Sequence, residues 1–203
     1  MYKHKTFTLF RFVILTMIVV SCNKSKSVEQ PQNALAGNWT FVSMKVQTKS
    51  TVQETIAGSV ESAVTTTNYT TIKNAGTITF STDSLFAVGL TYTVADSVRA
   101  YEYENGQFQD SLILPYNLTL PPMNSSSKYQ LIGTDSLYFP GGGGFSPSLP
   151  GGQATVASGG RIAFNGNSMT LTTKINQTTT QNMGGVSATS VVQATAVITL
   201  QKQ

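Results

Sequence analysis

Histidine and cysteine are almost absent from this 203-residue chain, and their scarcity excludes most familiar catalytic chemistry. His4 is the only histidine and Cys22 the only cysteine. The chain beyond Cys22 therefore lacks the groups for Ser-His-Asp or Cys-His catalysis and for ordinary zinc or copper sites. Glu102 and Glu104 lie two residues apart beside a turn, which is typical of a solvated strand face rather than of a facing catalytic pair. We expect no enzyme, no metal site and no cofactor.

Charge is scarce as well. Only 11% of the residues are charged, while 40% are hydrophobic, a balance unlike that of a disordered chain. Lys3, Lys5 and Arg11 supply three of the 13 basic residues and belong to a leader, so ten basic side chains remain beside nine acidic ones. The remaining chain has no basic cluster with interleaved aromatics, and we therefore expect no nucleic-acid partner.

Residues 1–21 have the anatomy of a signal peptide. A positively charged start precedes the apolar run from Phe12 to Val20, which is shorter than the about 20 residues of a membrane-spanning helix. The end of this segment, Val19-Val20-Ser21-Cys22, resembles the bacterial lipobox, in which the cysteine thiol receives diacylglycerol. The sequence thus predicts a lipoprotein that is cut before Cys22 and held to a membrane by acyl chains such as palmitate. A plain secretory signal and an N-terminal membrane anchor are the alternatives.

Residues 22–33 are interpreted as the lipidated cysteine and a flexible tether, because they are polar, contain a proline and lack periodicity. Asn23 is not the aspartate that retains many lipoproteins in an inner membrane. The expected location is therefore the outer membrane, on its periplasmic face or at the cell surface.

Residues 34–203 are predicted to form one all-β domain, because strand patterns dominate and no amphipathic helix is evident. Hairpin signals recur along the domain, at Asn105-Gly106, at Gly133-Thr134-Asp135 and at Asn165-Gly166. About eight to ten strands with up-and-down spacing are enough for a closed antiparallel barrel. The predicted strands cover 37–48, 60–72, 76–80, 85–94, 98–103, 108–114, 129–132, 136–139, 161–164, 169–179 and 189–201.

The opening of this domain, Leu35-Ala-Gly37-Asn-Trp39, resembles the Gly-x-Trp motif of lipocalins and related barrels. The resemblance implies a lipocalin-like barrel whose closed end is plugged by Trp39. It also implies a cavity for a small apolar ligand. The second lipocalin motif, Thr-Asp-Tyr, is not found, and Thr134-Asp135-Ser136 matches it only in part.

Two functions follow from the barrel. In the first, the barrel binds a small apolar ligand, and alternation along one strand places four side chains on the lining face. These are Phe86, Val88, Leu90 and Tyr92. Plain core packing explains the same residues equally well. In the second, the barrel is filled and serves as a structural or adhesive module with an envelope protein as its partner. The Gly- and Pro-rich segment 140–160 is interpreted either as a flap over the barrel mouth or as an inert linker.

Four aspartates beyond the leader begin the same kind of triplet, Asp-Ser followed by an aliphatic residue. Turn chemistry explains the pattern, since Asp and Ser bond to nearby backbone at turns. The triplet also resembles a signal for O-glycosylation in one group of Gram-negative bacteria. That resemblance implies sugars on four serines: Ser84, Ser97, Ser111 and Ser136.

Overall fold

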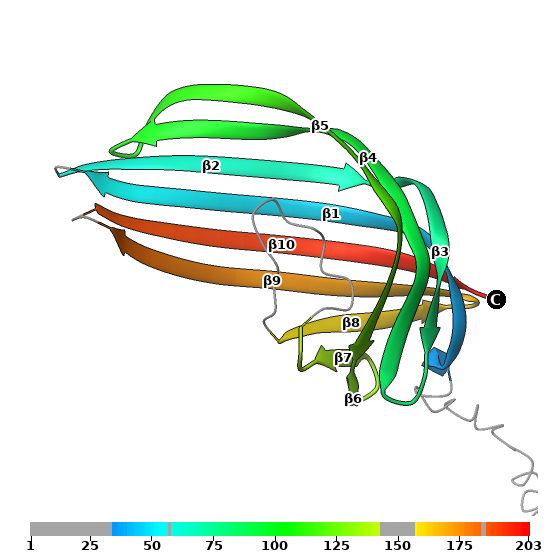
Figure 1. The fold of residues 1–203 in the computed structure, drawn as a ribbon. Helices are drawn as coiled ribbons and strands as arrows, with labels where there is room; N and C mark the ends of the chain where they lie inside the picture. The colour runs from blue at the N-terminus through cyan, green and yellow to red at the C-terminus, as the bar shows by residue number, and fades with distance from the viewer. Residues whose placement is uncertain (1–33, 57, 143–156, 184–185) are drawn as a thin grey trace, which may run out of the picture.

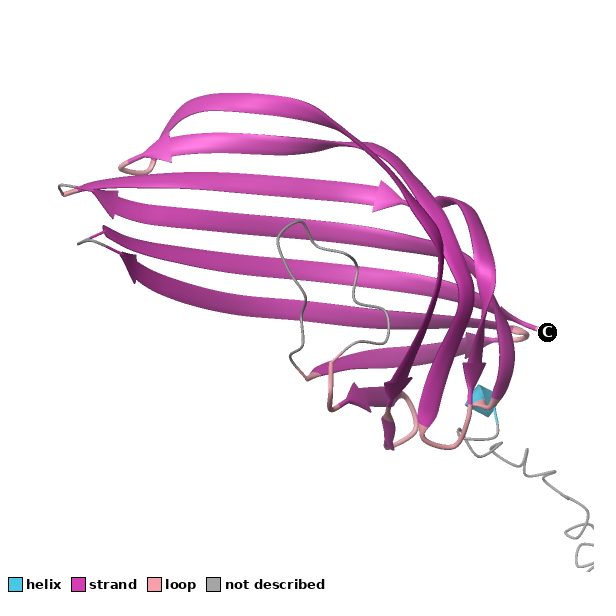
Figure 2. Ribbon diagram, viewed as in Figure 1, coloured by secondary structure: helices cyan, strands magenta, loops and turns pink. Residues whose placement is uncertain are grey.

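The computed structural model describes residues 34–56, 58–142, 157–183 and 186–203. Cys22, the predicted tether and residues 143–156 of the glycine-rich segment lie outside these ranges. The described chain forms almost nothing but strands (Figure 2). Their bounds are β1 Gly37–Ile56, β2 Ser59–Thr70, β3 Ile72–Phe80, β4 Ser84–Glu104, β5 Gln107–Lys128, β6 Gln130–Ile132, β7 Ser136–Phe139, β8 Ser158–Asn165, β9 Ser168–Met183 and β10 Val186–Lys202 (Figure 1).

The predicted all-β antiparallel fold is confirmed, and the ten strands of the described residues fall within the expected number. Asn105 and Gly106 form the β4–β5 turn with positive φ angles of 47° and 78°, the backbone that an Asn-Gly hairpin requires. The strands are longer than predicted. The expected break between 94 and 98 is absent, because Ala95, Asp96 and Ser97 continue the pairing of β4 with β5.

The strands close into a ring at one end of the molecule. β1, β3 and β4 are neighbours, and on the other side of β1 the order is β10, β9, β8, β7 and β6. β5 pairs with β4 up to Lys128, and the chain then runs through Tyr129 into β6, which pairs with β7. The β5–β6 run therefore joins the two edges of the sheet and completes the ring (Figure 1).

Beyond the ring, six strands continue as one open sheet in the order β5, β4, β2, β1, β10 and β9 (Figure 1). We call this part the sheet extension. It comprises residues 45–56, 59–70, 95–104, 107–118, 174–183 and 186–195. β1 alone has 20 residues, which at about 3.3 Å each gives a strand of roughly 65 Å. The lipocalin resemblance implies a fully closed barrel, whereas a barrel-like ring is present at one end only.

The hydrophobic core fills the ring end. Its buried residues come from nearly every ring strand and form one cluster with members such as Trp39, Phe41, Ile78, Phe80, Leu85, Tyr92, Phe139, Leu171, Ile198 and Leu200. Side chains of the sheet extension are mostly half-buried or exposed. Burial of apolar surface therefore stabilises the ring, whereas strand pairing and packing along the long strands must stabilise the extension.

The predicted common face of Phe86, Val88, Leu90 and Tyr92 is wrong. Leu90 and Tyr92 are buried in the core, but Phe86 and Val88 are 44% and 57% exposed. The cause is a bulge at Gly89, where φ is +63° and the pairing of β4 with β5 shifts between Ala87 and Leu90. An extra residue in a strand exchanges its two faces.

Hydrogen bonds connect the junction between β5 and β6 to the turn between β3 and β4. The backbone N–H of Tyr129 donates to the Asp83 carbonyl at 2.8 Å, and its hydroxyl donates to the Ser81 carbonyl. Lys128 Nζ donates to Asp83 Oδ2 at 2.7 Å. This hydrogen bond is the main reason that the pKa of Asp83 is lowered, while burial raises the pKa of Tyr129. These contacts fix the residues through which the chain passes from β5 into β6, where no direct ladder joins β5 to β7.

Candidate functional site

The interior of the ring is occupied by side chains. Leu90 and Tyr92, two of the four residues predicted to line a ligand cavity, pack within the core cluster. The aromatic side chain of Tyr92 lies edge-on to that of Phe41, with their centroids 6.3 Å apart. Phe86 and Val88 point out of the ring and cannot join the other two. The structure therefore does not bring the four predicted ligand-binding residues together.

Trp39 lies at the ring end and is 1% exposed. Its indole Nε1 donates to the Leu35 carbonyl at 2.9 Å, and Lys202 Nζ lies 5.4 Å from the centroid of the Trp39 indole. Lys202 also donates to the Ala34 carbonyl at 3.0 Å. Gly37 begins β1 with φ of +117°, a backbone that favours glycine. The Gly-x-Trp segment thus joins the first described residues to the last strand at the ring end.

The sheet extension has two chemically different faces. Side chains alternate along a strand, and directly opposite residues share a face. We call the face that continues from buried Val46, Val94 and Ala196 the inner face, and the opposite one the outer face. Val98, Leu112 and Leu114 lie on the inner face through the pairing of β4 with β5. Leu112 and Leu114 are 55% and 47% exposed, so this face presents apolar groups beyond the ring.

Charges in the described part of the extension are sorted between these faces. Pairing and alternation place all six carboxylates on the inner face, namely Glu54, Glu61, Asp96, Glu102, Glu104 and Asp110. The four cations lie on the outer face, namely Lys45, Lys49, Arg99 and Lys174. The two faces therefore carry charges of opposite sign.

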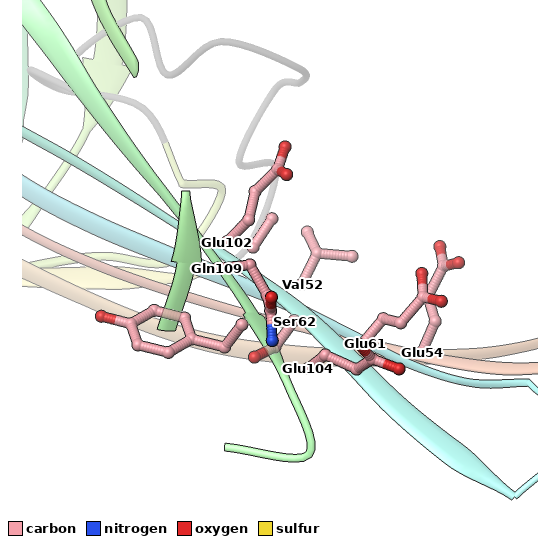
Figure 3. A pocket seen from close by; sticks show the side chains of 9 residues that line it. Val52, Glu54, Glu61, Ser62, Glu102, Glu104 and Gln109 are labelled. Atoms are coloured by element: carbon pink, nitrogen blue, oxygen red, sulfur yellow. The ribbon is translucent and has the colours of Figure 1, made fainter. Parts of the chain in front are cut away.

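Four glutamates gather at the far tip of the inner face. Glu54 lies directly opposite Glu61, and Glu61 directly opposite Glu104. Glu102 joins this row from the next inner position of β4. All four line a hollow of about 410 Å³ that also includes Val52 and Gln109. Figure 3 shows Glu54, Glu61 and Glu102 on the same side of the sheet. Like charges directly opposite each other destabilise a sheet, so this row is not explained by folding.

Glu61 is the middle carboxylate of the row, between Glu54 and Glu104. Glu61→Gln removes one charge and keeps the shape, so we expect the free energy of unfolding to rise by about 0.2–1 kcal/mol at neutral pH and low salt. Urea unfolding followed by circular dichroism measures the change. Added salt should reduce this increase in the free energy of unfolding because it screens exposed charges. A loss of stability would show that the Glu61 carboxylate makes a contact that the fold requires.

The Asp-Ser triplets do not share one structural setting. Asp83 and Asp135 lie in turns, as predicted, but Asp96 and Asp110 lie within β4 and β5, so the turn interpretation is wrong for these two. The proposed glycosylation residues also differ in accessibility. Ser84 is 6% exposed, Ser97 and Ser136 are half-buried, and Ser111 is exposed.

Sequence reasoning missed the glutamate row. The spacing of Glu102 and Glu104 beside a turn predicts only a solvated face, and it does not connect them with Glu54 and Glu61. The missing signal was the turn at Gly58. With residues 56 and 59 paired, the two glutamates lie opposite each other in the hairpin of β1 and β2.

Within the described ranges, no group of three or more His, Cys, Asp or Glu side chains has a geometry that could hold a metal ion. None of the described helical residues forms a segment long and apolar enough to cross a membrane.

Comparisons with known proteins leave the family open. No protein-family model matches the chain, and no curated protein sequence matches it. Among solved structures, the chain is similar to Ail, the attachment invasion locus protein of Yersinia pestis. The match covers 81% of this chain and 99% of that chain, with 7% identity and a TM-score of 0.17. This similarity does not assign the chain to a family.

Proposed function

We propose that the protein is a non-catalytic structural or adhesive module of the bacterial cell envelope, held to the outer membrane by lipid on Cys22. The observation that carries this proposal is the contrast between the two ends of the described domain. The ring is filled by one buried cluster, while the sheet extension exposes two faces with sorted charges.

The filled ring favours a structural module over a lipocalin-like carrier. A carrier needs a cavity of several hundred Å³ with an open mouth. Here Leu90 and Tyr92, which would line it, are 8% and 5% exposed and pack into the core. The exposed surface of the extension is what the protein offers to an envelope partner. A small apolar ligand inside the ring is therefore not part of the proposal.

The position of the first described residues supports the same assignment. Leu35, the second described residue, is buried at the ring end, and Ala34 is held there by Lys202. Lipid on Cys22 would therefore hold the ring end close to the membrane and leave the sheet extension accessible. We propose that the ring lies next to the membrane and that the sheet extension is the surface that contacts an envelope partner.

Intact mass of the detergent-extracted full chain under denaturing conditions tests the anchor. We expect residues 1–21 to be absent and Cys22 to carry diacylglycerol and further acyl mass. Cys22→Ala should show no lipid mass. A wild-type chain without lipid, or one that keeps its leader, would contradict the anchor. Hexose-type increments in the same spectrum would support sugars on the Asp-Ser triplets, of which Ser111 is the most accessible.

A further inference from the structure

Among the described residues, one edge of the sheet extension has no neighbouring strand along much of β9. β9 pairs with β10 along its whole length, but on its other side it pairs with β8 only from Ser168 to Thr173. From Lys174 to Met183, the described residues place no strand on that side. Every second backbone N–H and C=O of an edge strand points outward without a ladder partner. This stretch is therefore a template for another strand.

The opposite edge of the extension, formed by β5, is protected. Within the extension, β5 contains Pro115, and proline cannot donate to a ladder. It also carries the exposed charge of Asp110 and an irregularity in its pairing with β4 between Glu102 and Tyr103. Natural sheets use such devices to block edge pairing. Between Ile175 and Met183, β9 has no proline, no glycine and no charge.

The open stretch of β9 is a sequence palindrome. Residues 176–182 are Asn-Gln-Thr-Thr-Thr-Gln-Asn, flanked by the apolar residues Ile175 and Met183. In an antiparallel pair centred on Thr179, each of these seven residues would face an identical residue. The palindrome lies on β9 beyond Thr173, the last residue that pairs with β8, and before Val186, where β10 begins.

We propose that two copies of this chain pair through their β9 edges, antiparallel, with Thr179 at the two-fold axis. The pairing joins two six-stranded extensions into one twelve-stranded sheet. An isologous contact of this kind closes on itself and does not grow into a fibre. Cross-strand threonine pairs already occur within the chain, with Oγ1 atoms 2.7 Å apart in Thr48–Thr67 and 3.3 Å apart in Thr180–Thr189. The Thr178–Thr180 tract can form the same pairs between copies.

The pairing fixes the orientation of the two copies. The two-fold axis lies perpendicular to the sheet, so both inner faces, with their glutamate rows, lie on the same side. The paired strands run in opposite directions, so the two rings lie at opposite ends of the shared sheet. This orientation relative to the membrane rests on the proposed lipid anchor, whereas the pairing itself does not. With both copies in one membrane, the shared sheet lies along the membrane surface.

Disulfide trapping in the full-length chain tests the pairing and its register. Residues opposite each other in antiparallel strands have Cα atoms about 4.5–5.5 Å apart, within the about 4.4–6.8 Å that a disulfide spans. We expect Thr179→Cys to give a covalent homodimer under mild oxidation. Asn176→Cys is the matched control, because it lies on the same exposed edge but about 20 Å from its own copy across the axis. Its fraction of covalent dimer should not exceed that of the wild-type chain, which retains Cys22.

The outcomes separate the possible occupants of the edge. A homodimer specific to Thr179→Cys supports the proposal, as does a dimer of the unaltered chain in sedimentation. Equal cross-linking of the two variants overturns the register. A Thr179→Cys product that contains a different protein, or no product together with a monomeric unaltered chain, overturns the second copy as occupant. The lipid on Cys22 can fail its own test without changing any of these results.

Discussion

Replacing Trp39 with alanine should lower the free energy of unfolding by about 3–5 kcal/mol, the cost of removing a large aromatic side chain from a packed core. Trp39 is 1% exposed and touches both the start of the domain, through Leu35, and the last strand, through Lys202. Its loss opens a cavity where the ring is closed. Because it is the only tryptophan, unfolding in urea should be followed by far-ultraviolet circular dichroism.

Val88→Ala is the control for this experiment. Val88 lies in the same ring but is 57% exposed, so its truncation should change the free energy of unfolding by no more than about 0.5 kcal/mol. Comparable losses for Trp39→Ala and Val88→Ala would contradict the face exchange at Gly89. A negligible loss for Trp39→Ala would contradict the filled ring.

Gly76→Ala should be the other severely destabilising substitution. Gly76 has φ of +119°, and an added Cβ would lie 2.7 Å from the Leu90 Cα and 2.9 Å from the Gly89 carbonyl oxygen. The left-handed backbone alone costs about 1–3 kcal/mol for a residue with a side chain, and the backbone clash adds about 1–3 kcal/mol. We expect the midpoint of urea unfolding to fall accordingly.

Gly89→Ala separates the two contributions. Gly89 also has a positive φ, +63°, but an added Cβ there meets nothing within 4 Å. It should show only the backbone cost of about 1–3 kcal/mol, less than Gly76→Ala. Equal losses for the two variants would show that β3 and β4 do not approach each other as closely as the structure places them.

Local patterns in the sequence predicted the strands well. The Asn105-Gly106 turn and the alternating runs carry their own signals, because turn chemistry and side-chain periodicity are local properties. The predicted face of Phe86 and Val88 failed because a bulge depends on the neighbouring strand, in this case on how closely Gly76 approaches Leu90. Periodicity within one strand does not contain that information.

The candidate site was less predictable for the same reason. The glutamate row is assembled from β1, β2 and β4, and its members meet only through the registers of Glu54 with Glu61 and of Glu61 with Glu104. The open edge of β9 depends on where the described part of β8 begins. The palindrome at 176–182 is visible in the sequence, but only the sheet order places it on a strand edge that β8 does not cover.

Native mass spectrometry of the detergent-extracted full-length protein tests whether the ring is filled and the protein works through its exposed sheet. We predict a mass that equals the lipidated polypeptide, in single or paired copies, with no small molecule released on denaturation. A small apolar molecule that co-purifies in stoichiometric amount and leaves on denaturation would show that the ring is not filled and would favour the carrier function.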